Sequence, residues 1–231
     1  MIAAILTHGG AGNDGSVRDG CEAACRAGLT TSSALDAAIA AVLVLEDDPR
    51  MNAGTGAVLR LDGKAQMDAS VMTLHRFGAV AVVEDVKNPV LLARAVHDSP
   101  HMMLAGAGAG ELADRLGLAR ASPVTERQRA RHAARMAHLD DEPSFRRLYT
   151  GVDEKFWRIA VAAGEASDTV GAVVRASDGT FAAASSTGGI WCAVRGRVGD
   201  TPIPGAGVYV GEAGAVAATG TGEFIWREML A

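Results

Sequence analysis

The stretch DTVGAVVRASDGTFAAASSTGG, residues 168–189, decides the fold of this chain. Two apolar runs, residues 170–175 and 180–186, flank the dipeptide Asp178-Gly179. An Asp-Gly pair between apolar runs is the strongest short-range signal of a β-hairpin. The stretch therefore predicts two antiparallel strands, with Thr169 before the first strand and Thr187 at the end of the second.

Segments before this hairpin predict a chain in which helices and strands are mixed. A capping box from Ser33 to Asp36 starts a helix that runs to about residue 46, and Asn88-Pro89 starts another. Asp62-Gly63 predicts a further hairpin, built from residues 56–61 and 64–70. The remaining expected elements are strands at residues 2–7, 79–83 and 101–105, a helix at 19–27 closed by Gly28, and a helix at 111–116 stopped by Gly117.

Composition places the chain among globular proteins. Of its 231 residues, 48% are apolar and 21% are charged, so it carries enough apolar surface to fold. The longest apolar run, residues 37–45, is far shorter than the roughly 20 residues of a membrane helix. A net charge of −5 argues against nucleic acid as the main partner. Three cysteines without a pairing pattern, and an N-terminus without a signal-like basic region, predict a cytoplasmic location.

The stretch from about residue 120 to residue 168 differs from the rest. Residues 120–150 are rich in arginine and poor in large apolar side chains, which predicts a solvated helix followed by a mobile linker. Glycine-rich, strand-forming sequence resumes at Asp168-Thr169. The 28 glycines of the chain cluster without a period, which is typical of tight turns and of backbone that approaches a ligand.

Short segments in both halves carry the functional signal. They are residues 8–12 (HGGAG), 52–56 (NAGTG), 67–70 (MDAS), 168–173 (DTVGAV), 186–189 (STGG), 196–200 (GRVGD) and 218–223 (ATGTGE). Together, and in this order, they resemble the plant-type asparaginase family, which comprises isoaspartyl peptidases and L-asparaginases among the N-terminal-nucleophile hydrolases. The resemblance covers nearly the whole chain except the basic stretch.

The resemblance implies an α+β fold, a four-layer αββα sandwich of the N-terminal-nucleophile hydrolase type. It implies one domain over residues 1–231, cut between Asp168 and Thr169 into an α subunit (1–168) and a β subunit (169–231). The precursor, or the processed αβ unit, is expected to form a homodimer. Relatives continue past the segment at 218–223 with a helix and strands, so the chain is expected to be short at its C-terminal end.

The chemistry of an N-terminal threonine explains the cut. A threonine hydroxyl becomes a nucleophile when a base removes its proton, and an N-terminal threonine carries that base as its own α-amine, with a pKa of about 8. Thr169 is internal, so cleavage after Asp168 has to release the amine. The resemblance assigns Thr169 as the nucleophile, Thr187 as the hydrogen-bond partner of its hydroxyl, and Thr219 with Gly220 as the oxyanion hole.

The resemblance also implies a pocket for a free amino-acid end. In the segment Arg197-Val198-Gly199-Asp200, Arg197 would bind the substrate α-carboxylate in a bidentate pair, a geometry that guanidinium offers. Asp200, with the Gly222 carbonyl, would accept hydrogen bonds from the α-ammonium group, and Asn52 would lie near the nucleophile. The expected substrate is therefore L-asparagine or a β-aspartyl dipeptide.

Relatives hold a structural sodium ion through backbone carbonyls, and hard cations prefer such oxygen ligands. The matching residues are Leu45, Glu46, Asp48, Met51, Ala53 and Thr55. No other cofactor, no nucleic acid and no membrane is expected as a partner.

Two alternatives stay open. Aspartate at position 168 is also found in glycosylasparaginases and in the taspase-type protease, so a hydrolase of either kind is the second enzyme hypothesis. The short C-terminal end suggests a third reading, a catalytically silent relative.

Overall fold

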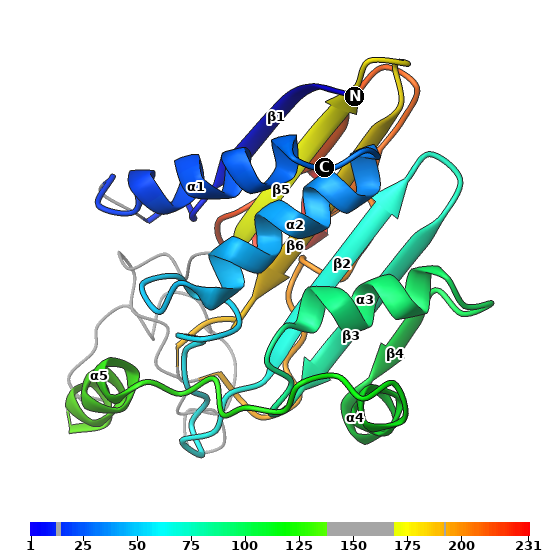
Figure 1. The fold of residues 1–231 in the computed structure, drawn as a ribbon. Helices are drawn as coiled ribbons and strands as arrows, with labels where there is room; N and C mark the ends of the chain where they lie inside the picture. Colours follow the sequence, from blue (N-terminus) through cyan, green and yellow to red (C-terminus); the bar gives the residue numbers. More distant parts are fainter. Residues whose placement is uncertain (13–14, 138–168, 192) are drawn as a thin grey trace.

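The computed structural model describes residues 1–12, 15–137, 169–191 and 193–231. A six-stranded sheet forms its centre, in the order β1-β5-β6-β2-β3-β4 (Figure 1). Neighbouring strands are antiparallel except for the parallel pair β3 and β4. The strands are β1 (Ile2–His8), β2 (Met67–Thr73), β3 (Phe77–Val83), β4 (Met103–Ala105), β5 (Val170–Ala176) and β6 (Phe181–Thr187).

Helices cover one face of this sheet. Helix α1 (Arg18–Leu29) packs on β1, α2 (Ala34–Asp47) on β5 and β6, and α3 (Pro89–His97) on β2 and β3 (Figure 1). Helices α4 (Gly106–Arg115) and α5 (Glu126–Ala137) follow. The main apolar core lies between α1, α2, α3 and the sheet.

A small second sheet lies on the opposite face. Strands β7 (Val208–Val210) and β8 (Ala215–Ala217) pair with each other and pack against β2, β5 and β6. Helix α7 (Gly222–Glu228) comes next in the chain. The chain is therefore a mixed α and β structure, in which a multi-stranded sheet is covered by helices on one side and by β7 and β8 on the other.

Alternation along the strands explains which residues face each layer. In β5, Val170, Ala172 and Val174 belong to the core under the helices, whereas Val173 belongs to a second cluster with β7. Successive side chains of a strand point to opposite faces. The side chain of Thr169 therefore shares the β7–β8 face with Val173.

The hairpin predicted from residues 168–189 is confirmed, because β5 and β6 pair from Val170 with Ser186 to Arg175 with Phe181. The capping box is confirmed as well: the Ser33 hydroxyl accepts the Asp36 N–H at 3.1 Å and donates to the Asp36 carboxylate at 2.6 Å.

The hairpin predicted around Asp62-Gly63 is wrong in its first arm. The turn forms, since the Arg60 N–H donates to the Lys64 carbonyl at 2.8 Å, but residues 57–60 are not a strand. Strand β2 pairs instead with β3 and β6. Residues 57–60 are buried, and their N–H groups donate to the Gly54 carbonyl, the Asn52 side chain and the Lys64 carbonyl in place of a neighbouring strand.

Three helix or strand boundaries also differ from the expectation. Gly28 lies inside α1, pressed between Ile5 and the Ala37 carbonyl, so it serves close packing and does not end the helix. Helix α4 begins at Gly106, several residues earlier than expected, and β4 covers only Met103–Ala105. Helix α3 begins at Pro89 as predicted, but the buried Glu46 carboxylate, not Asn88, accepts the Val90 N–H at 3.0 Å.

The helix predicted in the basic stretch is found as α5, and its side chains make specific contacts. Gln128 is 3% exposed and its amide donates to the Gly56 carbonyl, while His132 Nε2 lies 2.9 Å from the Arg60 carbonyl oxygen. The guanidinium groups of Arg131 and Arg135 stack over the Trp191 ring. The predicted linker, residues 138–168, lies outside the described residues.

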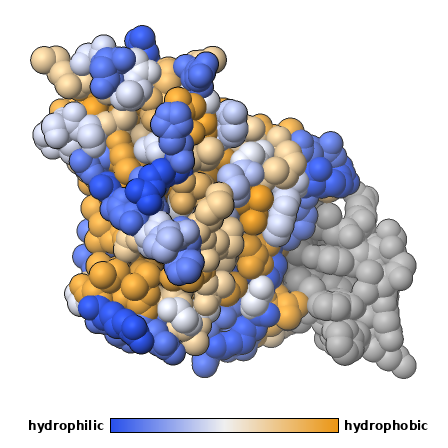
Figure 2. Space-filling view, turned by 90° about the vertical axis from the view of Figure 1, so that its right-hand side faces the viewer, coloured by the Kyte–Doolittle hydropathy of each residue, from blue (hydrophilic) through white to orange (hydrophobic). Residues whose placement is uncertain are grey.

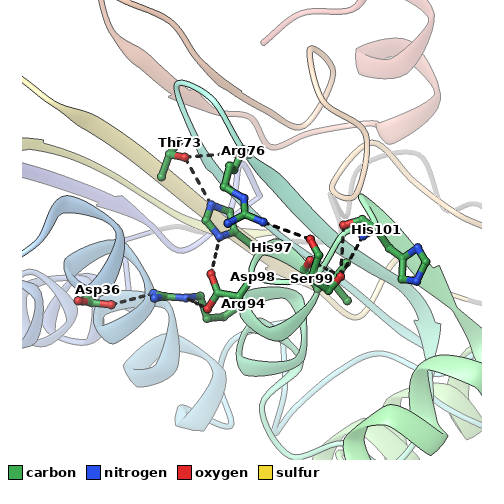
Figure 3. Close-up of polar contacts among 9 residues, drawn as sticks. Asp36, Thr73, Arg76, Arg94, His97, Asp98, Ser99 and His101 are labelled. Atoms are coloured by element: carbon green, nitrogen blue, oxygen red, sulfur yellow. Dashed lines mark hydrogen bonds and ion pairs between the residues drawn. The ribbon is translucent and has the colours of Figure 1, made fainter.

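A polar network fixes the end of α3 on the helix-covered side (Figure 3). His97 lies between Asp98, at 2.9 Å from Nδ1, and the Thr73 hydroxyl, at 3.4 Å from Nε2. Arg94 donates to Asp98 and, across to α2, to Asp36, each at 2.8 Å. These contacts tie α3 to α2 and to the β2–β3 hairpin.

The side of the molecule that carries β4 mixes apolar and charged side chains (Figure 2). Met102, Met103 and Leu116 are at least a third exposed. Among the described residues, none of the helices has both the length and the apolar character needed to cross a membrane.

Candidate active site

The predicted nucleophile and its partner lie level on neighbouring strands. Thr169 directly precedes β5 and Thr187 ends β6, and the adjacent residues Val170 and Ser186 are register partners. The next strand, β2, places Asp68 opposite Thr187. Thr169, Thr187 and Asp68 therefore form a row across three strands, and each is at most 4% exposed.

The turn after Thr187 is held by side chains from two directions. The Thr187 hydroxyl oxygen accepts the Gly189 N–H at 3.0 Å, and the Asn52 amide donates to the Gly189 carbonyl at 2.8 Å. Asn52 Oδ1 accepts the Val58 N–H at 2.9 Å. A Cβ on Gly188 would lie 2.3 Å from Asn52 Oδ1, so only glycine allows this approach. These contacts place Asn52 against the turn that follows Thr187, and its predicted position near Thr169 stays a prediction.

The predicted substrate-binding residues converge on Gly222. A Cβ on Gly222 would lie 2.7 Å from Asp200 Oδ1 and 2.8 Å from Arg197 Nη2. Arg197 donates from Nε and Nη2 to Glu223, at 2.9 and 2.8 Å. The structure thus brings a guanidinium and a carboxylate together at Gly222, and Val198 and Gly199 connect them along the chain.

The Asp200 carboxylate has the features of a binding site for a cation. It is 4% exposed, and its Oδ2 atom has no hydrogen-bond partner among the described residues. Burial raises the pKa of Asp200 to about 6, against the opposing effects of its own backbone N–H and of the Arg197 charge. A buried carboxylate with an unused oxygen is a site for an ammonium group.

Thr219 and Gly220 follow β8, which packs on β5. The Thr219 hydroxyl is buried and has no partner among the described residues, and Gly220 has a φ of +147°. The unpartnered Thr219 hydroxyl is available to donate to a ligand oxygen, and the role of Thr219 and Gly220 as an oxyanion hole stays a prediction.

His8 is a neighbour of the nucleophile. It is the register partner of Gly171, and a Cβ on Gly171 would lie 2.3 Å from its Nε2 atom. The imidazole is close to the backbone of Thr169 and Ala217, and burial lowers its pKa.

Residues that the sequence analysis missed lie behind the substrate-binding segment. Arg60 and Asp68 are fully buried, and both contact the main chain of residues 197–199. One feature of the sequence pointed to both residues: each is a charged residue within an apolar run. Charged side chains are rarely buried unless their charge is paired. Asp168 lies outside the described residues.

The loop expected to hold sodium is tightly wound. The Glu46 carbonyl accepts the Thr55 N–H at 2.7 Å, and the Asp48 carbonyl accepts the Met51 N–H at 3.0 Å. A Cβ on Gly56 would lie 2.6 Å from the Met51 carbonyl oxygen, so this loop needs glycine there. Leu45 and Ala53 are fully buried.

The sequence of the whole chain was compared with known proteins. The family model described as Asparaginase matches residues 3–231. The chain belongs to the asparaginase family. Membership makes it a hydrolase and confirms the resemblance that the motifs indicated.

Individual relatives agree with this placement. The chain is 40% identical to a plant-type L-asparaginase of Pyrobaculum calidifontis, over 97% of the chain and 76% of the relative. It is 40% identical to a plant-type L-asparaginase of Pyrococcus furiosus, over 100% of the chain and 78% of the relative. An isoaspartyl peptidase of Salmonella typhimurium is 42% identical over 86% of the chain and 62% of the relative.

Proposed function

We propose that this chain is a threonine amidohydrolase that cleaves itself before Thr169 and then hydrolyses L-asparagine or β-aspartyl peptides. The observation that carries the proposal is that Thr169 and Thr187 lie opposite each other on neighbouring strands, while the side chains of Arg197 and Asp200 converge at Gly222. The first pair supplies a nucleophile on a rigid strand, and the second binds a free amino-acid end. The names of the relatives favour the same substrates.

Autocleavage begins with the Thr169 hydroxyl. It attacks the Asp168 carbonyl carbon, the C–N bond breaks, and the acyl group moves from nitrogen to oxygen. Water then hydrolyses the ester, which leaves an Asp168 carboxylate and a free Thr169 α-amine. The start of β5 suits this step because a residue held by a sheet keeps its hydroxyl in place.

Substrate hydrolysis uses the released amine as a base. The amine takes the hydroxyl proton while Thr169 Oγ1 attacks the side-chain amide carbon of the substrate. Thr219 and Gly220 donate to the oxyanion, a contribution of about 10²–10³ in rate per donor. Ammonia, or the amine of a peptide, leaves with the proton, and water hydrolyses the acyl-enzyme to release aspartate.

The two charged ends of the substrate set the position of its side chain. The α-carboxylate binds Arg197, whose contact with Glu223 keeps the guanidinium directed toward Gly222. The α-ammonium group binds the free oxygen of Asp200. Holding both ends delivers the amide carbon to Thr169 and lowers the entropic cost of attack.

We extend the proposal to the architecture. The four-layer αββα sandwich is supported by β7 and β8, which already form a second sheet on the central one. A structural sodium ion at the backbone oxygens of residues 45–55 is supported by Gly54 and Gly56, which leave room for the Glu46 and Met51 carbonyl oxygens, since a Cβ there would lie 2.5 and 2.6 Å from them. The homodimer, the division into subunits and the cytoplasmic location stay predictions.

The intact mass of the purified protein tests the proposal. After incubation we expect fragments of residues 1–168 and 169–231, with Thr169 at a new N-terminus. Thr169→Ala should remain one chain and hydrolyse no amide, whereas Thr169→Ser should retain both activities at reduced rate. Thr180→Ala, in the turn of the same hairpin, is the matched control. Amide hydrolysis by Thr169→Ala would contradict the proposal.

A substrate comparison separates the alternatives. L-asparagine, a β-aspartyl dipeptide and a glycosylated asparagine should be offered to the processed enzyme. Turnover of the glycosylated amide alone would favour the glycosylasparaginase-like reading. A folded wild-type chain that stays intact and hydrolyses none of them would favour the silent relative.

A further inference from the structure

Side chains on one face of β2, together with Gln66 just before it, hold the substrate-binding segment in position. Successive side chains of a strand alternate in direction, so every second residue of this stretch faces the same way. Three of these side chains bind the main chain of residues 196–201, in the segment between β6 and β7. The contacts are Gln66 with the Gly196 N–H at 2.7 Å, Asp68 with the Gly199 N–H at 3.4 Å, and Ser70 with the Thr201 carbonyl at 2.7 Å.

Arg60 completes this support from the irregular segment before β2. Its side chain is fully buried, and Nη2 donates to the carbonyls of Gln66 and Arg197, both at 3.1 Å. The guanidinium lies directly behind the turn of the nucleophile region, since a Cβ on Gly189 would lie 3.0 Å from Nη2. Arg60 therefore contacts both the segment that binds substrate and the turn that follows Thr187.

The charge of Arg60 is balanced by Asp68. Burial lowers the pKa of Arg60 to about 10, and the nearby Asp68 carboxylate is the foremost group that opposes this effect. Asp68 is itself fully buried, and its other oxygen accepts the Val82 N–H at 2.7 Å. The two groups attract each other without forming a direct ion pair, and burying opposite charges is costly for stability, so their presence calls for an explanation beyond folding.

We propose that Arg60 and Asp68 are positioning residues for substrate recognition. They grip the main chain on the two sides of Val198, at the Arg197 carbonyl and the Gly199 N–H, and so fix the spacing between the Arg197 guanidinium and the Asp200 carboxylate. That spacing has to match the distance between the α-carboxylate and α-ammonium groups of one amino acid. This inference rests on the proposed function, because it assigns the specificity of the same site.

The two steps of the proposed reaction separate positioning from folding. Autocleavage requires Thr169 and its strand but no bound amino acid, so it reports whether the nucleophile region is intact. Affinity for an amino-acid end reports the spacing of Arg197 and Asp200. A positioning role predicts damage to the second readout with the first preserved.

The experiment compares Asp68→Asn, Arg60→Gln and the double variant Arg60→Gln/Asp68→Asn. Asparagine has nearly the shape of aspartate but cannot balance the Arg60 charge, and the double variant leaves no buried charge without a partner. We expect each protein to autocleave. We expect KM for L-asparagine to rise roughly tenfold or more, as for a lost hydrogen bond to a charged group, with kcat within about threefold of wild type. The inhibition constant of L-aspartate should rise in parallel.

Two further variants test whether the effect on KM is specific to the Arg60 guanidinium. Arg60→Lys keeps the charge but offers no planar fork, so its KM should lie between those of wild type and Arg60→Gln. Arg94→Gln removes an ion-paired arginine from the helix-covered side, and its KM should equal that of wild type.

Three outcomes would overturn the inference. Unchanged KM and aspartate inhibition in Arg60→Gln and in the double variant would show that the pair does not set the spacing. Loss of autocleavage in the double variant, which retains no buried charge, would assign a structural role instead. A wild-type chain that hydrolyses no β-amide would overturn the proposed function and this inference together.

Discussion

Asp68 of β2 and Thr187 of β6 are register partners on neighbouring strands. Asp68 accepts a hydrogen bond from the substrate-binding segment, at the Gly199 N–H, and Thr187 accepts one from the turn beside the nucleophile, at the Gly189 N–H. One step across the sheet therefore connects the part of the site that holds the substrate to the part that attacks it.

Removing the Thr187 oxygen should slow both reactions of Thr169. Thr187→Val is nearly isosteric but leaves the buried Gly189 N–H without its acceptor, a cost of about 1–3 kcal/mol. We expect the rate of autocleavage and kcat to fall, by about 10- to 100-fold, with a smaller change in KM. Rapid sampling of the cleavage products and steady-state kinetics of the processed enzyme measure the two effects.

Thr187→Ser is the matched control, because serine keeps the oxygen that accepts the Gly189 N–H. It should retain most of the activity that Thr187→Val loses. Equal activity of the two variants would mean that the hydroxyl oxygen has no part in either step.

Ligand binding should weaken at acid pH through Asp200. Its pKa is raised to about 6, so the carboxylate is ionised above that pH and neutral below it. Only the ionised form attracts an α-ammonium group. The affinity for L-aspartate should therefore fall about tenfold for each pH unit below about 6, since one proton is taken up. Calorimetric titration of processed enzyme below pH 6 measures this, because the Thr169 amine, with a pKa of about 8, stays protonated over that range.

The variant Asp200→Asn separates this effect from other causes of acid sensitivity. It should bind L-aspartate weakly at every pH and show no step near pH 6. A step that persists in Asp200→Asn would have to arise from another group.

Local sequence signals predicted much of the fold, and the elements that were predicted wrongly depend on contacts between distant residues. Asp178-Gly179 and the Ser33 capping box act within a few residues, so the β5–β6 hairpin and the start of α2 followed from the sequence. The Asp62-Gly63 signal is equally local, and the turn is present. The residues before this turn, however, contact distant parts of the chain and do not form the first strand of a hairpin. Arg60 meets Arg197 across 137 positions of the chain. No spacing pattern in the sequence predicts a contact between two residues so far apart along the chain.

The candidate site, too, was predicted where local motifs define it and missed where distant residues meet. Motifs of the family pointed to Thr169, Arg197 and Asp200, and the structure places the last two together at Gly222. Asp68 stood in one of those motifs without a role, because its function depends on which loop passes over β2. Burial of a charge is visible only once the three-dimensional packing is known.

A methyl group on Gly171 should destabilise the sheet beside the nucleophile. Its Cβ would lie 2.3 Å from His8 Nε2 and 2.8 Å from Ala217 Cβ, so either β8 or the imidazole has to move. Overpacking of this kind costs about 1–3 kcal/mol, and we expect Gly171→Ala to lower the free energy of unfolding by that amount. Denaturant unfolding of the two proteins measures it.

Gly108→Ala supplies the control for this substitution. Gly108 lies in α4, and a Cβ there would meet nothing within 4 Å. Alanine is the better helix former, so this variant should be neutral or more stable than wild type by up to about 1 kcal/mol. If Gly171→Ala were as stable as Gly108→Ala, β8 would not pack tightly on β5.

Helix α5 should depend on Gln128 for its attachment to the rest of the chain. Gln128 is buried, and its amide donates to the carbonyl of Gly56, at the end of the loop that includes Asn52. Gln128→Ala removes this donor and leaves a buried carbonyl unpaired, at a cost of about 1–3 kcal/mol. Limited proteolysis should therefore cut within residues 126–137 faster than in wild type. Arg129→Ala changes an exposed residue of the same helix and should be cut at the wild-type rate. Equal cleavage of the two variants would mean that the Trp191 stacking and His132 are sufficient to hold α5 in place.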